Sequence, residues 1–185
     1  MIYSTEYIRS AAFPNSTVGW ETKCGTYTEG EQRINTIAGK QCWKAWWSGI
    51  SASEGSTKSM EIRQELSDIS HGVYALECKA ATEHHCLSDQ HAYMVIGGDT
   101  LLSPNLSYDR LDIPTLSDSA KWEVLATPPV YITDRQDVVI GFRGSKQGAT
   151  DNAWREYIPN STNRDMREGW WCATDFTLRF YPLYR

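Results

Sequence analysis

Tryptophan and tyrosine gather at three points of the sequence, each next to basic or polar residues. The three segments read CWKAWW at 42–47, DNAWREYIPN at 151–160 and EGWW at 168–171. An indole or phenol ring combines a flat apolar face with one polar group, and an arginine adds a planar fork of hydrogen-bond donors. The chain has eight Trp and ten Tyr but only four Phe, and this excess favours surfaces that contact a ligand as well as a core.

The segment CWKAWW places indoles on both sides of an extended strand. Trp43 and Trp47 would lie on one side and Trp46 on the other, because side chains alternate along a strand. Both sides are buried only if two layers cover the strand, so at least one indole is expected to be exposed. Trp47 is a candidate ligand contact; the alternative is that Trp43 and Trp47 fill the core.

The other two segments leave alternatives open. Trp154 and Tyr157 lie in a polar insertion without alternation, where large rings must bury against the domain's own surface or against a ligand. In the closing segment the strand phase is set by Phe176. An unbroken strand puts Trp170 in the core and makes Trp171 an outward ligand contact, whereas a bulge before Phe176 would exchange the two.

Two arginines are candidates for the polar half of such a site. Arg63, like Glu77, faces away from the apolar side of the central strands, and Arg143 follows the apolar Phe142. Charged side chains of this kind are solvated by default. On a ligand-binding face they would instead form hydrogen bonds with the ligand.

Catalytic and zinc signals are weak. The segment CKAATEHHCLSDQH holds Cys78, His84, His85, Cys86 and His91, but the spacing matches no common zinc site. A disulfide between Cys78 and Cys86 in an exported protein, or free thiols, fits the segment better than zinc. The sequence has no G-x-S-x-G, no H-E-x-x-H and no glycine-rich phosphate loop, so it assigns no catalytic residue.

Composition excludes several partners. The formal net charge is −5 and the basic residues are dispersed, which argues against nucleic acid. No apolar stretch is long enough for membrane insertion. The first residues lack the regions of a secretory signal, so the chain is cytoplasmic or its leader is absent from this sequence.

The strand pattern predicts an all-β sandwich formed by one domain over residues 1–185. Short runs rich in Val, Ile, Tyr, Trp and Thr alternate with turn signals. The segment SMEIRQELSDI also fits a helix, but a period of two puts Met60, Ile62, Gln64 and Leu66 on one face, and we interpret it as a hairpin with HGVYALECKA. Long loops are expected at about 101–120 and 145–169, where function often lies.

The order of these motifs resembles a known family. The segments VGWETKCG, CWKAWW, EIRQELSDISHGVYALECKA and WCATDFTLRFYPL are similar to those of galactose-binding-domain-like β-sandwich modules, found beside glycan-degrading enzymes and in surface proteins of gut Bacteroidetes. The resemblance covers nearly the whole chain. It implies a jelly-roll sandwich that binds an oligo- or polysaccharide, is secreted, periplasmic or held at the cell surface, and adjoins a glycan-active enzyme domain.

The resemblance also bears on cofactors. Family members with a structural calcium use an acidic residue near the first strand and an Asp in the closing motif; here Thr174 replaces that Asp. Glu21 and Asp175 are then the calcium candidates, although such an ion needs more oxygen ligands than two carboxylates supply. No other cofactor is expected.

On this interpretation the chain is a non-catalytic carbohydrate-binding module. Sugar rings stack on aromatic faces and their hydroxyl groups bond to polar side chains. One alternative is a structural or protein-interaction module with the same fold. The second alternative is a small glycan hydrolase or lyase with carboxylates that converge in a groove.

Overall fold

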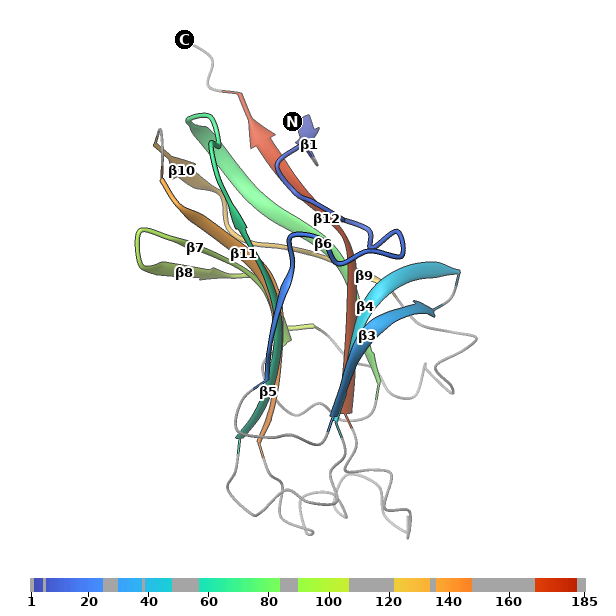
Figure 1. Cartoon of the computed structure of the whole chain (residues 1–185). Coiled ribbons are helices and arrows are strands. Elements are labelled where there is room, and N and C mark those ends of the chain that lie inside the picture. The colour runs from blue at the N-terminus through green and yellow to red at the C-terminus, as the bar shows by residue number, and fades with distance from the viewer. Residues whose placement is uncertain are drawn as a thin grey trace, which may run out of the picture.

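The chain forms a sandwich of two antiparallel sheets that face each other (Figure 1). A computed structural model describes residues 2–4, 6–24, 30–37, 39–47, 57–83, 90–106, 122–133, 136–147 and 169–182. Within these ranges all regular elements are strands, which confirms the predicted all-β sandwich. None of the described residues forms a helix of the length and apolarity needed to cross a membrane.

The larger sheet has seven strands. Its central order is β10-β6-β12-β4-β3, and β1 and β9 pair with β12 and β6. The strands are β1 (Ile2–Ser4), β3 (Gly30–Ile37), β4 (Lys40–Trp47), β6 (Gly72–Glu83), β9 (Glu123–Ala126), β10 (Val130–Ile132) and β12 (Gly169–Tyr181).

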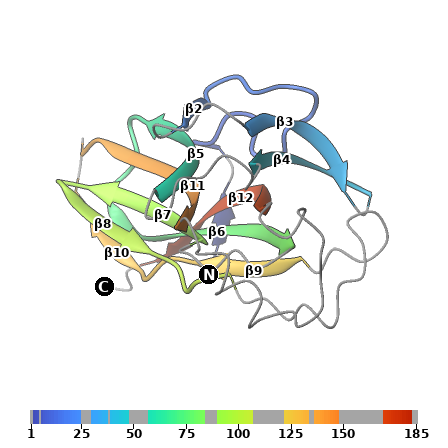
Figure 2. The ribbon, with the colours of Figure 1, turned by 90° about the horizontal axis from the view of Figure 1, so that it is seen from below.

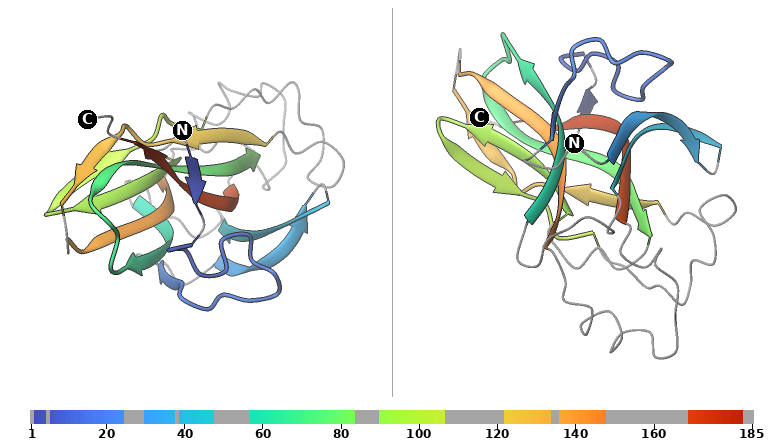
Figure 3. Two further views of the ribbon diagram at one scale, coloured as in Figure 1. Left: turned by 90° about the horizontal axis from the view of Figure 1, so that it is seen from above. Right: turned by 60° about the horizontal axis from the view of Figure 1, so that its bottom comes forward.

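The smaller sheet has five strands in the order β2-β5-β11-β7-β8. They are β2 (Glu21–Cys24), β5 (Thr57–Leu66), β7 (Gln90–Ile96), β8 (Asp99–Leu102) and β11 (Val138–Gln147). Figure 2 shows this sheet and the larger one as two layers, and the views in Figure 3 show the same separation.

Alternation along β5 explains why it is a strand and not a helix. Met60, Ile62, Gln64 and Leu66 are all buried, so the face with a period of two enters the core, as predicted. The one polar residue on this face, Gln64, has its hydrogen bonds satisfied, because its amide donates to the Arg9 carbonyl at 2.9 Å and accepts from the Arg9 N–H at 2.8 Å.

The predicted hairpin of β5 and β6 is wrong. The two strands belong to different sheets, because β5 pairs with β2 and β11 while β6 pairs with β12, β9 and β10. Ile69, in the short connection between them, is 2% exposed. The chain therefore passes through the edge of the core here and joins the two layers, so that both apolar faces meet across the sandwich.

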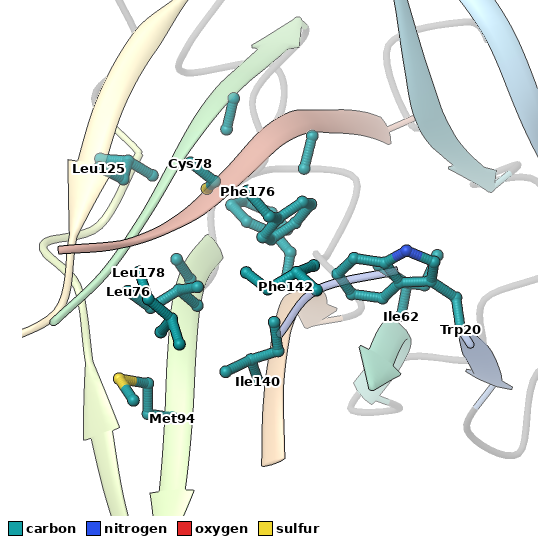
Figure 4. Close-up of a cluster of buried hydrophobic side chains, with 14 of the residues drawn as sticks. Trp20, Ile62, Leu76, Cys78, Met94, Leu125, Ile140, Phe142, Phe176 and Leu178 are labelled. Carbon is teal, nitrogen blue, oxygen red and sulfur yellow. The ribbon is translucent and has the colours of Figure 1, made fainter. Parts of the chain in front are cut away.

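The core lies between the sheets and is rich in aromatic rings (Figure 4). Phe142 of β11 and Trp171 of β12 meet across the layers with ring centroids 4.7 Å apart. Phe176 packs against Trp20 at 4.8 Å. These contacts between the sheets fix the positions of the strands, and so of the outward residues between the core positions.

A β-bulge in β12 reverses the phase of its first half. The pairing of β12 with β6 shifts register between Thr174 and Thr177, and Asp175 there has φ of 52°, a conformation that aspartate tolerates better than most residues. Phe176 and Trp171 are both fully buried as a result. The prediction that Trp171 points outward is therefore wrong, and the bulge, which was the alternative left open for this segment, is the physical reason.

The predicted long loops are described only in part. In the first predicted loop, residues 101–102 belong to β8, and residues 107–120 lie outside the described residues. In the second, residues 145–147 belong to β11 and residue 169 belongs to β12, while residues 148–168 lie outside the described residues.

Candidate functional site

The two predicted arginines come together on the outer face of the five-stranded sheet. Arg63, Gly141 and Tyr93 form one cross-strand row of β5, β11 and β7, and a second row lies two residues further along these strands. Residues in register point to the same side of a sheet. We call this surface the Tyr93 face and define it by Glu61, Arg63, His91, Tyr93, Gly141 and Arg143.

The end of the Tyr93 ring lies over Gly141. A Cβ added to Gly141 would lie 2.7 Å from both Cζ and Oη of Tyr93, so the missing side chain makes room for the ring. Tyr93 is only 3% exposed although it faces away from the core. Burial, followed by the charge and hydrogen bond of Glu61, raises the pKa of Tyr93, so its hydroxyl stays protonated.

Arg143 covers the tyrosine ring. Its guanidinium carbon lies 5.6 Å from the ring centroid of Tyr93, within the range of a cation–π contact. Arg63 is held differently, because its Nη2 and Nε lie 3.1 and 3.3 Å from Oε2 of Glu21 on the neighbouring strand β2. The two guanidinium groups therefore stand on one face in positions that protein contacts already fix.

His91 adds a third polar group to this face. Its Nδ1 lies 2.7 Å from the carbonyl oxygen of Ser103. A carbonyl only accepts hydrogen bonds, so Nδ1 donates the proton of this bond and the bond fixes the orientation of the ring. The Tyr93 face thus presents charged donors, carboxylate acceptors and an imidazole.

Sequence reasoning missed Tyr93 and considered His91 only as a zinc ligand. The signal was present in HAYMVIG, where His91 and Tyr93 alternate with the buried Ala92 and Met94. An aromatic residue opposite a glycine on the next strand is a common sheet-stabilising pair. The register that brings Tyr93 opposite Gly141 depends on tertiary structure and is not readable from either strand alone.

Among the other predicted ligand contacts, the prediction for Trp171 is wrong, and those for Trp47, Trp154 and Tyr157 stay predictions. Trp171 is fully buried in the core and presents no surface for stacking. Trp47 ends β4, in register with Gly30 and Gly169. Trp154 and Tyr157 lie outside the described residues.

Of the cysteine and histidine segment, the structure describes Cys78 and His91. Cys78 is a free thiol in the core, and burial raises its pKa. His84, His85 and Cys86 lie outside the described residues. In the part of the chain that the structure describes, no three His, Cys, Asp or Glu side chains gather as a metal-binding group.

The two calcium candidates are both engaged by basic side chains. Asp175 Oδ2 lies 2.8 Å from Lys40 Nζ and 3.2 Å from Lys79 Nζ, and Glu21 pairs with Arg63 at 3.1 Å. A calcium ion would have to displace these three cations. Calcium binding at Glu21 and Asp175 thus stays a prediction that the present contacts do not favour.

The ion pairs of Asp175 predict pH-dependent stability. Partial burial would raise its pKa, but the hydrogen bonds and charges of Lys40 and Lys79 outweigh this and lower it. A lowered folded-state pKa stabilises the fold above the ordinary value of 3.8, and this contribution is lost as the pH falls through the folded-state pKa.

Asp175→Asn should therefore lower the free energy of unfolding by about 0.5–1 kcal/mol at neutral pH. Asparagine also tolerates positive φ, so the bulge is retained. Denaturant titrations at several pH values should show the gap to the wild type closing below pH 3.8. Asp99→Asn, at the exposed start of β8, controls for the loss of one surface charge; a gap that does not change with pH would contradict the assignment.

Comparison with known proteins shows the fold. No protein-family model and no curated protein matches the sequence. The structure is similar to TmCBM61, a carbohydrate-binding module in complex with beta-1,4-galactotriose, with TM-score 0.50, 12% identity, and coverage of 95% of this chain and 98% of that chain. It is also similar to the enzymatically active domain of bacteriophage CBA120 tailspike protein 4, with TM-score 0.57 and 7% identity, over 95% of this chain but 21% of that one.

Proposed function

We propose that this chain is a non-catalytic carbohydrate-binding module and that the Tyr93 face contributes its polar contacts. The observation that carries the proposal is the pair of fixed guanidinium groups of Arg63 and Arg143 on one sheet face. Sugar hydroxyl groups both donate and accept hydrogen bonds. A face with arginine donors and the Glu61 carboxylate offers them both kinds of partner.

The fixed position of Arg143 favours binding. A side chain that protein contacts already order loses less conformational entropy when a ligand arrives. Because Tyr93 is nearly covered, its ring supports Arg143 and does not itself provide a stacking surface. We therefore expect modest affinity at this face, with water filling part of the contact.

The fold adds support. TmCBM61, which shares the architecture over nearly its whole length, was solved with beta-1,4-galactotriose. Trp47, Trp154 and Tyr157 remain part of this proposal as stacking partners. So does an extracellular setting, secreted, periplasmic or at the cell surface, beside a glycan-active enzyme domain.

A glycan array followed by calorimetry tests the proposal. We expect the wild type to bind at least one glycan, and Arg143→Ala to weaken that binding on the order of tenfold, because a charge-assisted hydrogen bond contributes about 1.5–3 kcal/mol. Arg9→Ala is the matched control, since Arg9 is exposed in the connection between β1 and β2. Silence across plant, host and microbial glycans would contradict the function; unchanged binding by Arg143→Ala would contradict the assignment of this face.

A structural or interaction module is the second candidate. Val124 and Tyr131 are 54% and 51% exposed on β9 and β10, which both pair with β6. Exposed apolar residues on neighbouring short strands suit a contact with another domain. A silent array together with loss of a domain contact in Tyr131→Ser would favour this function. A reducing-sugar assay on the array glycans tests the hydrolase or lyase alternative.

A further inference from the structure

Arg143, on the Tyr93 face, is a half-buried cation without an acidic partner among the described side chains. Its guanidinium carbon lies 5.6 Å from the ring centroid of Tyr93. Within the described ranges, no hydrogen bond or ion pair joins this guanidinium to a protein acceptor. Taking a charge partly out of water costs solvation energy, and proteins commonly offset that cost with a group of opposite charge. The N–H donors of Arg143 are therefore available to a ligand.

Several other basic side chains on the outer faces of the two sheets do have carboxylate partners. They are half-buried, as Arg143 is, so a different depth on the sheet does not explain why Arg143 lacks one. The pairs are Arg63 with Glu21, Arg179 with Glu77, and Lys40 and Lys79 with Asp175. Arg143 thus departs from the pattern that its neighbours follow.

The carboxylate opposite Arg143 is used in another way. Glu61 of β5 is in register with Arg143 of β11, yet within the described ranges the two side chains form no ion pair. Glu61 acts on the Tyr93 hydroxyl instead, where its charge and hydrogen bond add to the effect of burial in raising the pKa. Glu61 and Arg143 therefore act on different parts of the same tyrosine.

The position of Arg143 is fixed before a ligand arrives. The Tyr93 ring that supports it is 3% exposed, and the end of this ring occupies space that a Cβ on Gly141 would need. A side chain that is ordered in this way loses little conformational entropy on binding. The planar guanidinium also matches the two oxygens of a carboxylate, with which it forms two parallel hydrogen bonds. A carboxylate is thus the partner group that best fits Arg143.

Arg63 adds a second guanidinium to the same part of the face. It is in register with Gly141, two residues before Arg143 along β11, so the two arginines are diagonal neighbours. The contacts of Arg63 with Glu21 use Nε and Nη2, which leaves the Nη1 donors outside that pair. Two cations on neighbouring strands repel each other, and a bound anion relieves this repulsion. The second arginine therefore also favours an acidic ligand.

The acidic residues of the face limit how much charge such a ligand can carry. Glu21, Glu61 and Glu65 belong to the same side of β2 and β5, and they would repel a densely charged polyanion. Hydroxyl groups, in contrast, donate hydrogen bonds to carboxylates. The face thus suits a ligand in which one carboxylate is surrounded by hydroxyl groups, and a uronic acid residue of an oligosaccharide has this composition.

We propose that Arg143 binds the carboxylate of a uronic acid residue, so that the Tyr93 face prefers an acidic oligosaccharide to its neutral counterpart. The inference rests on the proposed carbohydrate-binding function. It goes beyond that function in naming the class of sugar and the side chain that selects it.

Calorimetry of the full chain with matched acidic and neutral sugars tests the proposal. The probes are the trisaccharides of galacturonate and of glucuronate, and the methyl ester of each, which keeps the sugar skeleton and removes the charge. We expect at least one acid to bind on the order of tenfold more tightly than its ester, because the ester cannot form the charge-assisted pair with a guanidinium. Added salt should narrow this difference, since it screens the charges.

Substitutions at Arg143 locate the effect. Arg143→Gln should make acid and ester bind alike, and Arg143→Lys, which keeps the charge but not the planar fork, should retain only part of the preference. Arg9→Ala, in the exposed connection between β1 and β2, is the matched control and should retain all of it. In the wild type, the NMR signal of the Arg143 Nε–H, assigned by its absence in Arg143→Lys, should shift with the acid and stay in place with the ester. This last measurement does not depend on a variant that folds poorly.

The outcomes separate this inference from the proposed function. Glycan binding without a preference for either acid over its ester overturns the ligand class alone. A preference for the acid that persists in Arg143→Gln, with no shift of the Arg143 signal in the wild type, overturns the role of Arg143. No binding to these sugars or to any glycan of the array overturns the proposed function and this inference together.

Discussion

Gly141→Ala is expected to lower the free energy of unfolding by about 3 kcal/mol or more. The added Cβ would collide with the carbonyl oxygen of Ile62 and would lie 2.7 Å from the Tyr93 ring. The carbonyl belongs to the backbone of the paired strand β5, so it moves only if the ladder moves. The ring would have to leave the face, and Arg143 would lose its support with it.

Denaturant titration of Gly141→Ala measures this effect. Val139→Ala, which changes a half-buried residue on the same strand and face, is the control and should cost about 1 kcal/mol. Tyr93→Ala combined with Gly141→Ala should recover only part of the loss, because the Ile62 carbonyl remains. A Gly141→Ala protein as stable as the control would show that the sheet yields easily at this point, and would remove the case for a rigid Tyr93 face.

Alternation predicted the strands because it is a local property. In β5 the buried positions Met60, Ile62 and Leu66 follow a period of two, and the same rule holds for Phe176 and Leu178 in β12. Each strand needs an apolar face for the core, whichever strand it pairs with. The sandwich fold follows from many such strands without a long helix.

The pairing of the strands, and the sheet face that each residue of β12 occupies, were not predictable in the same way. Nothing in β5 or β6 alone says that they enter different sheets, because both carry one apolar face and a short connection joins them. The bulge depends on a single residue, Asp175, with positive φ. The one local signal is that aspartate accepts this conformation more readily than most residues. A bulge at this residue moves every earlier residue of β12 to the opposite face of the sheet.

In the candidate site, too, the outward direction of single residues was predictable from the sequence, but their neighbours on other strands were not. Arg63 and Arg143 were predictable as outward residues, since each alternates with buried neighbours. That they flank Tyr93 depends on the order β5-β11-β7, which joins segments far apart in the sequence. Trp171 was assigned to a ligand because the bulge in β12 reverses its phase.

Trp171→Ala is expected to be the second severe substitution, with a loss of about 3–5 kcal/mol. Trp171 is fully buried and its ring centroid lies 4.7 Å from that of Phe142 on the facing sheet. Its indole fits against Gly144, where an added Cβ would overlap Cδ1 and lie 2.6 Å from Nε1. Removing the ring leaves a cavity between the two layers that the paired strands are too constrained to close.

A double-mutant cycle of Trp171→Phe and Gly144→Ala tests this contact directly. Gly144→Ala alone should be strongly destabilising, and the phenyl ring of Trp171→Phe should relieve part of the overlap, which gives a coupling free energy of about 1 kcal/mol or more.

Trp20→Phe is the matched core control. The Trp20 indole N–H donates to the Ser10 carbonyl at 3.2 Å, whereas that of Trp171 has no hydrogen-bond partner among the described residues. Trp20→Phe should therefore lose about 1 kcal/mol of hydrogen-bond energy that Trp171→Phe does not. Additive losses in the cycle would mean that Trp171 and Gly144 do not press on each other, and that the close approach of the two sheets at this point is not what requires the glycine.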